Sequence, residues 1–405
     1  MAKTAARSAV SAEIRPADIA ARAARAVKEI GALKRARDAA CAIAQQAQVR
    51  EALTRSELAL ALIETLQARD AALALARRAA LGLYAARAPA RPHAPTTRAA
   101  RLRQAAWLRT GHEGEARLLI ASGLWRGDDL AAASAYTARK ADPAARPDSL
   151  FDQPWYLAQH PEAASYGRAP LTHYLLHGAA KGYAPHPLFD LAWYGAQTAL
   201  ELHAQRRSPL AHYLLRGAGL GRSPHPLFDV GGYLAQEPQL GPDEDPLSHY
   251  LRQGWREGLW PHPLFDPDWY RRQAPDMGET APLAHYAAEG WRRRLSPHPL
   301  FDAAWYIARN PDLGERDALA HFVTSGGAEG RDPSPWFDVA RYRGQRGEAL
   351  AAGANPLVDY LQGGAWTLPE TREGLPTAAY LAANPELVAR GLTPLEHWAR
   401  KGGPA

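Results

Sequence analysis

The feature that most constrains this chain is an internal repeat in residues 151–405. A Phe-Asp pair recurs at steps of 38, 39, 37, 36 and 36 residues, with its aromatic members at Phe151, Phe189, Phe228, Phe265, Phe301 and Phe337. A tyrosine follows each phenylalanine by five residues, and Tyr380 continues this register into a seventh, degraded copy. A unit this short buries its apolar face only against its neighbours. The spacing therefore predicts a stacked array of about seven repeats.

The second half of each unit carries a Pro-Leu-x-His-Tyr motif. Its best-preserved histidines are His173, His212, His249 and His285, and a glycine follows each of them by five residues. We interpret this glycine as a helix stop and the Pro-His-Pro segment after it as an extended connector. The aspartates of Phe-Asp suit helix N-caps, because a carboxylate accepts first-turn N–H groups; they include Asp190, Asp229, Asp266 and Asp302. Each unit is thus predicted to be two short helices and a rigid link.

Composition agrees with a helical fold. The chain contains only eight valines and seven isoleucines in 405 residues, whereas a parallel sheet buried on both faces needs many. We therefore predict an all-α protein, in which an N-terminal helical hairpin precedes an α-solenoid-like array of about seven two-helix repeats.

Three regions are predicted along the chain. Residues 1–90 are Ala-rich and basic, and the proline-free stretch 17–86 suggests two long helices, about 17–52 and 55–86, that self-associate or dock on a protein partner. Residues 91–148 combine a proline-rich linker with a small helical module. Residues 149–405 hold the tandem repeats.

The consensus LFDxxWYxxxxPD…PLxHYxxxGxxEGRxPHPLFD resembles a repeat of bacterial proteins. That repeat often lies beside glycosyltransferase domains in surface-polysaccharide enzymes and also in large bacterial surface proteins. The resemblance covers about residues 149–403 and is carried by segments such as Asn310-Pro311-Asp312, Pro282-Leu283-Ala284-His285-Tyr286 and Glu329-Gly330-Arg331. It implies a glycan-related context, although this chain lacks the glycosyltransferase domain.

Catalytic and metal-binding patterns are weak. Ten of the fifteen histidines occupy the two repeated positions, and we interpret them as structural, each ring nitrogen bonding a neighbouring backbone group. Metal ligation by these histidines is the alternative, but each helix and each linker offers only one. Cys41 is the single cysteine, and Asp243-Glu244-Asp245 has a DxD-like form without a supporting sheet. We predict no catalytic residue, no metal and no cofactor.

Tryptophans near the repeat ends are the candidate binding residues. Trp255, Trp260, Trp291, Trp336 and Trp366 fall outside the Trp-Tyr register, which is itself expected to be core, so these five are expected to be exposed. Trp255, Trp260 and Trp291 are expected to form one strip that stacks on sugar rings. Arginines beside them suit an anionic polymer, and they are Arg256, Arg292, Arg293 and Arg294.

The distribution of charge and the lack of a targeting segment limit the cellular locations that we expect for this chain. Residues 1–100 carry 17 Lys/Arg against 8 Asp/Glu, whereas residues 151–405 carry 23 against 28. No apolar segment suits a membrane span or a Sec signal, so we expect a chain made in the cytoplasm that stays there or leaves on a particle released by lysis. The predicted function is non-enzymatic binding or scaffolding of bacterial cell-surface polysaccharide, with nucleic acid disfavoured. The alternative is a glycosyltransferase-related enzyme or enzyme subunit of polysaccharide synthesis.

Overall fold

The computed structural model of the chain describes residues 25, 28–32, 34, 55–87, 98–126, 128–205, 208–236, 238–241, 244–368, 370–372 and 374–402. Within these ranges the protein is all-α except for an antiparallel pair of short strands, β1 (Glu370–Arg372) and β2 (Leu375–Pro376). The predicted fold class is confirmed. The first predicted helix, 17–52, lies almost entirely outside the described residues, whereas the second is the long helix α2 (Arg55–Arg87).

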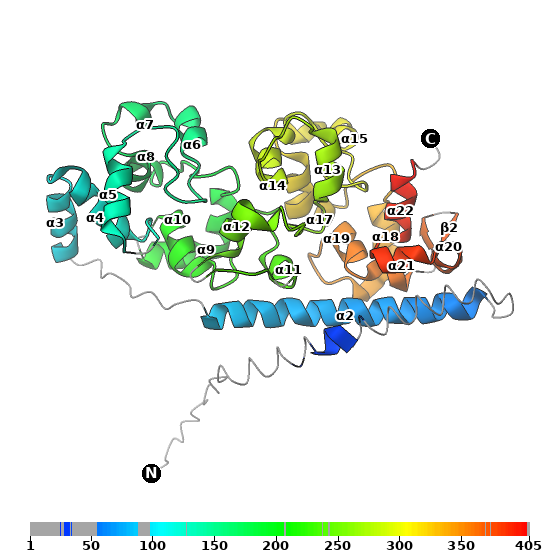
Figure 1. The fold of residues 1–405 in the computed structure, drawn as a ribbon. Helices are drawn as coiled ribbons and strands as arrows, with labels where there is room; N and C mark the ends of the chain where they lie inside the picture. Colours follow the sequence, from blue (N-terminus) through cyan, green and yellow to red (C-terminus); the bar gives the residue numbers. More distant parts are fainter. Residues whose placement is uncertain are drawn as a thin grey trace, which may run out of the picture.

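Seven repeats form the body of the protein (Figure 1). We number them from the phenylalanine position as repeats 1 (151–188), 2 (189–227), 3 (228–264), 4 (265–300), 5 (301–336), 6 (337–374) and 7 (375–402). Their first helices are α6 (Gln153–Gln159), α9 (Leu191–Gln205), α11 (Val230–Leu234), α13 (Pro267–Gln273), α15 (Ala303–Arg309), α18 (Val339–Arg346) and α20 (Thr377–Ala383). Their second helices are α8 (Pro170–His173), α10 (Pro209–His212), α12 (Pro246–His249), α14 (Pro282–His285), α16 (Ala318–His321), α19 (Pro356–Leu361) and α22 (Pro394–Arg400).

Further helices and 3-10 turns lie in front of the array and within its repeats. Helices α3 (Arg98–Trp107), α4 (Gly111–Ser122) and α5 (Leu130–Ala138) form the module in front of repeat 1. Within the repeats lie α7 (Glu162–Ser165), α17 (Gly327–Glu329) and α21 (Glu386–Arg390), and the 3-10 turns η5 (Pro311–Leu313), η7 (Gly347–Ala349) and η8 (Gly364–Thr367). No described helix combines the length and apolar character needed to cross a membrane.

The predicted N-caps are confirmed. Asp190 accepts the backbone N–H of Trp193 at 2.9 Å, and Asp302 accepts that of Trp305 at 3.0 Å. Asp229 and Asp266 cap α11 and α13 in the same way. Four of the second helices begin in a similar way, with a proline at the first helical position and an N-cap at Ser208, Asp245, Asn355 or Thr393.

The predicted helix stop at the repeated glycine is wrong for repeats 1–5. There the second helix runs on through one π-helical turn, in η1 (Tyr174–Gly178), η2 (Tyr213–Gly217), η3 (Tyr250–Gly254), η4 (Tyr286–Gly290) and η6 (Phe322–Gly326). In η1 the N–H of Ala179 donates to the carbonyl of Tyr174 at 2.8 Å, the five-residue bond of a π-turn. The left-handed residue comes four positions after the glycine, and in repeat 4 it is Arg294, with φ 56°.

A buried tyrosine explains why the glycine is needed. In repeat 3 the hydroxyl of Tyr233 bonds Nδ1 of His249 at 2.7 Å, and a Cβ on Gly254 would lie 1.9 Å from that hydroxyl. The same arrangement joins Tyr156 to His173, Tyr194 to His212, Tyr270 to His285 and Tyr306 to His321, at 2.6–2.9 Å. These tyrosines are fully buried. The glycine is therefore a packing requirement of the tyrosine hydroxyl, not a turn signal.

Two kinds of hydrogen bond recur along the array. The first closes a repeat on itself: the backbone N–H of the Phe-Asp aspartate donates to a proline carbonyl of the linker that ends the same repeat, as from Asp190 to Pro224 at 2.8 Å and from Asp229 to Pro261 at 2.7 Å. The tyrosine of each His-Tyr pair reaches the start of the next second helix. Tyr286, for example, donates to the N-cap Asp317 at 2.7 Å. The aspartate bond therefore fixes the linker of each repeat, and the tyrosine bond fixes the stacking of one repeat on the next.

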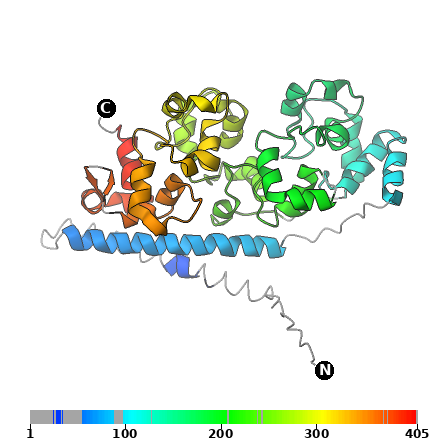
Figure 2. The same ribbon diagram turned by 180° about the vertical axis from the view of Figure 1, so that it is seen from behind.

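The array curls so that units three repeats apart also touch. Arg400 of repeat 7 donates to Asp266 of repeat 4, and Glu396 lies 3.3 Å from Nε2 of the fully buried His298. At the other end, Arg126 of the leading module pairs with Asp245 of repeat 3. The repeats therefore form a tight superhelix, which Figure 2 shows from behind.

Helix α2 lies along one side of this superhelix and contacts α11 of repeat 3, η8 of repeat 6 and α20 of repeat 7 (Figure 1). Leu62 and Leu66 are fully buried, and Asp70 accepts the indole N–H of Trp366 at 2.8 Å. A row of glycines lets the helix approach: a Cβ would lie 2.5 Å from Arg77 on Gly232, 2.9 Å from Leu81 on Gly221 and 3.2 Å from Asp70 on Gly363. In the structure α2 therefore docks within its own chain.

Replacing Gly254 with alanine is expected to destabilise the protein. The new methyl group would collide with the Tyr233 hydroxyl and break its bond to His249, at a cost of about 2–4 kcal/mol in the free energy of unfolding. Gly195 is the matched control, because an added Cβ there meets no atom within 4 Å on helix α9. Gly195→Ala should be neutral or stabilising by up to about 1 kcal/mol. Urea denaturation followed by circular dichroism measures both, and equal stabilities would contradict the packing role.

Candidate functional site

The histidines of the His-Tyr motif are bound inside the repeats. Each uses Nδ1 for the tyrosine hydroxyl of its own unit, so the partner is a side chain and not the backbone group that we expected. On the far side of the ring, Nε2 of His285 lies 2.8 Å from Glu289. Repeat 6 replaces the histidine with Asp359, which accepts from Tyr342 and pairs with Arg346 at 2.8 Å. These rings position helices and leave no nitrogen pair facing a common ligand.

For the histidines of the Pro-His-Pro linkers, the predicted hydrogen bond between a ring nitrogen and a backbone group is confirmed. Nδ1 of His186 accepts the N–H of Leu188 at 2.9 Å, and His225, His262 and His298 accept in the same way at 3.0–3.2 Å. Burial lowers the pKa of His186 and His225 to about 4 and that of His262 to about 3. Ser334 takes this position in repeat 5, where it accepts the N–H of Trp336. The ring thus accepts a backbone hydrogen bond that shapes the linker, and in His186, His225 and His262 it does so as a neutral group.

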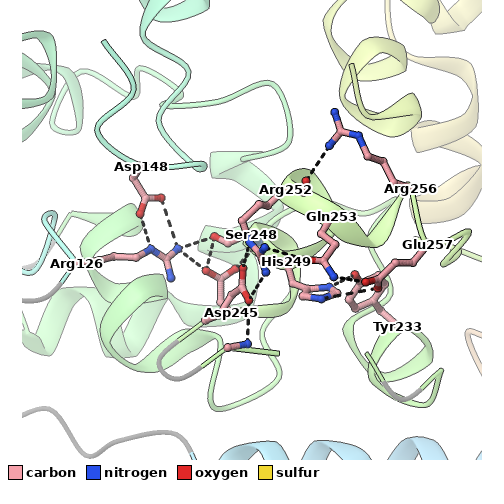
Figure 3. A network of polar contacts seen from close by, with 12 residues as sticks. Arg126, Asp148, Tyr233, Asp245, Ser248, His249, Arg252, Gln253, Arg256 and Glu257 are labelled. Carbon is pink, nitrogen blue, oxygen red and sulfur yellow. Dashed lines mark hydrogen bonds and ion pairs between the residues drawn. The ribbon is translucent and has the colours of Figure 1, made fainter. Parts of the chain in front are cut away.

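The densest polar network surrounds Asp245, the last residue of the DxD-like segment (Figure 3). One carboxylate oxygen of Asp245 accepts the N–H of Ser248 at 3.0 Å, and the other accepts from Arg126, which also pairs with Asp148. Burial alone would raise the pKa of Asp245, but Arg126 and Ser248 outweigh it and hold that pKa below its usual value.

The other acidic residues of the DxD-like segment do not complete a metal site. Glu244 is held by Arg252 at 2.8 Å, and Asp243 lies outside the described residues. Across the described ranges, no group of three His, Cys, Asp or Glu side chains is placed to hold a metal ion. The Asp245 network therefore acts as a structural joint between the leading module and repeat 3.

The predicted tryptophan strip is divided by the fold. Trp255 is only 7% exposed and Trp366 only 2%, so the expectation that these rings are exposed is wrong. Both rings fill the core, Trp255 beneath the π-turn of repeat 3 and Trp366 beneath α2. Trp336 and Trp291 are half-buried, and Trp260 is 36% exposed. Of the three residues of the strip, Trp260 and Trp291 therefore remain partly accessible, whereas Trp255 does not.

The four predicted arginines surround these rings in different ways. The guanidinium of Arg256 lies 4.2 Å from the Trp255 ring centre and also bonds Glu279, and that of Arg292 lies 4.3 Å from the ring centre of Trp291. Arg293 makes two bonds to Asp276, at 2.9 and 3.2 Å. Arg294 occupies the left-handed position at the end of repeat 4. Arg292 therefore combines a stacked guanidinium with N–H groups that no described carboxylate occupies.

Sequence reasoning missed a second series of rings in the Trp-Tyr register. Trp155, Trp193, Trp269 and Trp305 are half-buried, whereas the tyrosine beside each is fully buried. Arg272 lies 5.1 Å from the ring centre of Trp269, and Arg309 lies 5.1 Å from that of Trp305. The spacing of three or four residues between Trp and Arg, typical of one helix face, was the available signal. The arrangement adds partly exposed Trp–Arg pairs to repeats 4 and 5.

Acid is expected to destabilise the array through the linker histidines. Three of them, His186, His225 and His262, have a lowered pKa and stay neutral in the folded state near pH 5, whereas histidines of the unfolded chain titrate at about pH 6.5, so the unfolded state binds more protons below that pH. Stability should be full above pH 6.5 and fall towards pH 4, by on the order of 1–2 kcal/mol per histidine at pH 5. Denaturant-induced unfolding at pH 8 and at pH 5 measures this difference in the free energy of unfolding. His225→Ser, which copies Ser334, should shrink the difference; an unchanged difference would contradict the assignment.

Removing the Asp245 carboxylate is expected to be costly. Asp245→Ala removes one of the two carboxylates that bind Arg126 and the N-cap of α12, which should lower the free energy of unfolding by about 2–4 kcal/mol. Glu279→Ala is the control, because Glu279 pairs with Arg256 while 86% of its side chain is exposed. That change should stay within about 0.5 kcal/mol. Similar losses in both variants, measured by thermal denaturation, would count against a joint at Asp245.

Comparison of the chain with protein families, curated proteins and solved structures returns no match.

Proposed function

We propose that the chain is a non-enzymatic repeat protein whose array binds or scaffolds a cell-surface polysaccharide. The observation that carries the proposal is the recurrence of arginine-covered tryptophans on successive repeats, at Trp269, Trp291 and Trp305. An indole face packs against the C–H face of a sugar ring. A guanidinium stacked on that indole keeps its N–H edge available for a carboxylate or phosphate. The pairs therefore suit an anionic polymer.

Repetition supports a polymeric ligand. Each ring adds only about 1 kcal/mol, so one pair binds weakly, whereas several pairs on one array bind one chain together. The surfaces occur in repeats 4 and 5, and the hydrogen bond from Tyr286 of repeat 4 to Asp317 of repeat 5 holds these two repeats together.

The N-terminal region and the cellular setting belong to the same proposal. Helix α2 exposes Leu60 and Leu75, 59% and 43% accessible, and these side chains favour a further contact of residues 17–86 with a second copy or a protein partner. The setting that we propose is a cytoplasmic accessory of polysaccharide synthesis or a component of a phage-like particle released by lysis.

Binding to immobilised polygalacturonate, with neutral dextran as comparison, tests this function. The parent chain should prefer the anionic polymer. Its affinity should fall when the salt concentration is raised from about 0.1 to about 0.5 M, because salt screens the attraction between arginine and carboxylate. The double variant Trp291→Ala with Arg292→Ala should bind about five- to tenfold more weakly. The control is Leu102→Ala on α3, where the leucine is 64% exposed. Equal binding by the double variant and the parent, with both folded, would count against the Trp–Arg surface.

A further inference from the structure

A cavity of about 490 Å³ lies where α2 crosses repeats 3, 6 and 7. Its walls come from α2 (Leu73, Arg77), from repeat 3 (Gln236, Trp260) and from repeats 6 and 7 (Gln362, Arg390). The volume falls within the range of roughly 300–1,000 Å³ that is usual for small-ligand sites. We propose that this cavity binds a single pyranose ring that bears one carboxylate, such as a uronic acid residue. The inference rests on the proposed polysaccharide function and names one site for it.

Repeat 3 departs from the other repeats at the positions that form this cavity. Where repeats 1, 2, 4 and 5 carry the register tryptophan, repeat 3 has Gly232. A Cβ there would lie 2.5 Å from Arg77 and 2.6 Å from the Asp229 carboxylate, and the absence of a side chain lets these two residues pair in the cavity wall. The loss of a large ring thus makes room for polar groups from α2.

Trp260 is a second departure and supplies a stacking surface. In repeats 4 and 5 the equivalent residues cap the next helix: Ser296 accepts the N–H of Ala303 at 3.0 Å, and Asp332 accepts that of Val339 at 2.8 Å. After repeat 3 this position of the next helix is Pro267, which has no N–H to cap. Position 260 is thereby free to carry a tryptophan, and its ring is 36% exposed while lining the cavity.

The backbone of Trp260 is held rigidly. Gln236 donates to its carbonyl at 2.8 Å and accepts its N–H at 2.9 Å. Gln197 makes the same two bonds to Ser223 in repeat 2, at 2.8 and 3.2 Å. The clamp therefore recurs in more than one repeat, and in repeat 3 it fixes a tryptophan beside the cavity, whereas in repeat 2 it holds a serine.

The charges in the walls select the ligand. Arg77 pairs with Asp229, Arg69 pairs with Asp70, and Glu396 lies against His298. Among the described residues no carboxylate forms an ion pair with the exposed Arg390, which leaves one cation for one negative charge. A phosphate with two charges would lie close to three carboxylates, whereas hydroxyl groups can donate to them. A singly charged sugar ring fits this balance.

Calorimetric titration of the full chain with D-glucuronate, D-glucose and uridine monophosphate tests the site. We expect saturable binding of glucuronate and weaker binding of the other two. Trp260→Ala should weaken glucuronate binding about five- to tenfold, and Trp260→Phe should restore most of it. Arg390→Gln should remove the preference for glucuronate over glucose. Gln236→Ala should weaken binding, whereas Gln197→Ala, which removes the same two bonds in repeat 2, should not.

Each contrary outcome overturns the inference. If glucose bound as tightly as glucuronate, the proposed recognition of a carboxylate would be wrong. If uridine monophosphate bound more tightly than glucuronate, the proposed ligand class, a singly charged sugar, would be wrong. Unchanged affinity in Trp260→Ala, with a parent-like thermal melt, would place the ligand elsewhere. If glucuronate does not bind while polygalacturonate does, this cavity is not the site but the proposed function stands. If the parent chain does not bind polygalacturonate either, the proposed function itself is rejected.

Discussion

The whole array depends on one contact, in which a buried tyrosine hydroxyl bonds a histidine ring and rests on a glycine of the second helix. It joins the two helices of a unit beside the ring contact of Tyr233 with Tyr250, and it requires a tyrosine of the first helix together with a histidine and a glycine of the second. Repeat 6 shows the constraint, because the histidine is lost there but the bond is kept. Asp359 accepts from Tyr342, and Arg346 balances the new charge. A carboxylate without that arginine would be a buried, unpaired charge.

A second constraint acts between distant units through the N-cap aspartates. A carboxylate has two oxygens, and capping a helix uses only one of them. The second oxygen takes an arginine from elsewhere in the chain: Arg77 at Asp229, Arg126 at Asp245 and Arg400 at Asp266. Local helix formation and the closure of the superhelix thus share the same aspartates, and the arginines that bind them come from α2, from the leading module and from repeat 7.

Much of the local structure could be predicted from the sequence, since caps such as Asp190 and Thr393 depend only on residues within one turn. The glycine was misread because a helix stop and a close tyrosine contact select the same residue, and only the distance from Tyr233 to Gly254 distinguishes them. Trp255 was misjudged for a related reason. Its position outside the tyrosine register indicated exposure, but the π-turn rotates it into the core. Contacts between repeats, such as Arg126 with Asp245, depend on curvature that spacing does not contain.

Differences between the repeats carry more information on function than the consensus does. A residue type that recurs at the same position of successive repeats is explained by the packing of the repeats alone. The repeated tyrosines and histidines therefore do not require a ligand to explain them. Gly232 and Trp260 break the register within one repeat, and both changes have structural preconditions that are met only there: Arg77 arrives on α2, and Pro267 removes an N–H that position 260 would otherwise cap. A change that requires a second, compensating change elsewhere is hard to explain as drift at a free surface. The place where the array stops repeating itself is therefore where recognition is best sought.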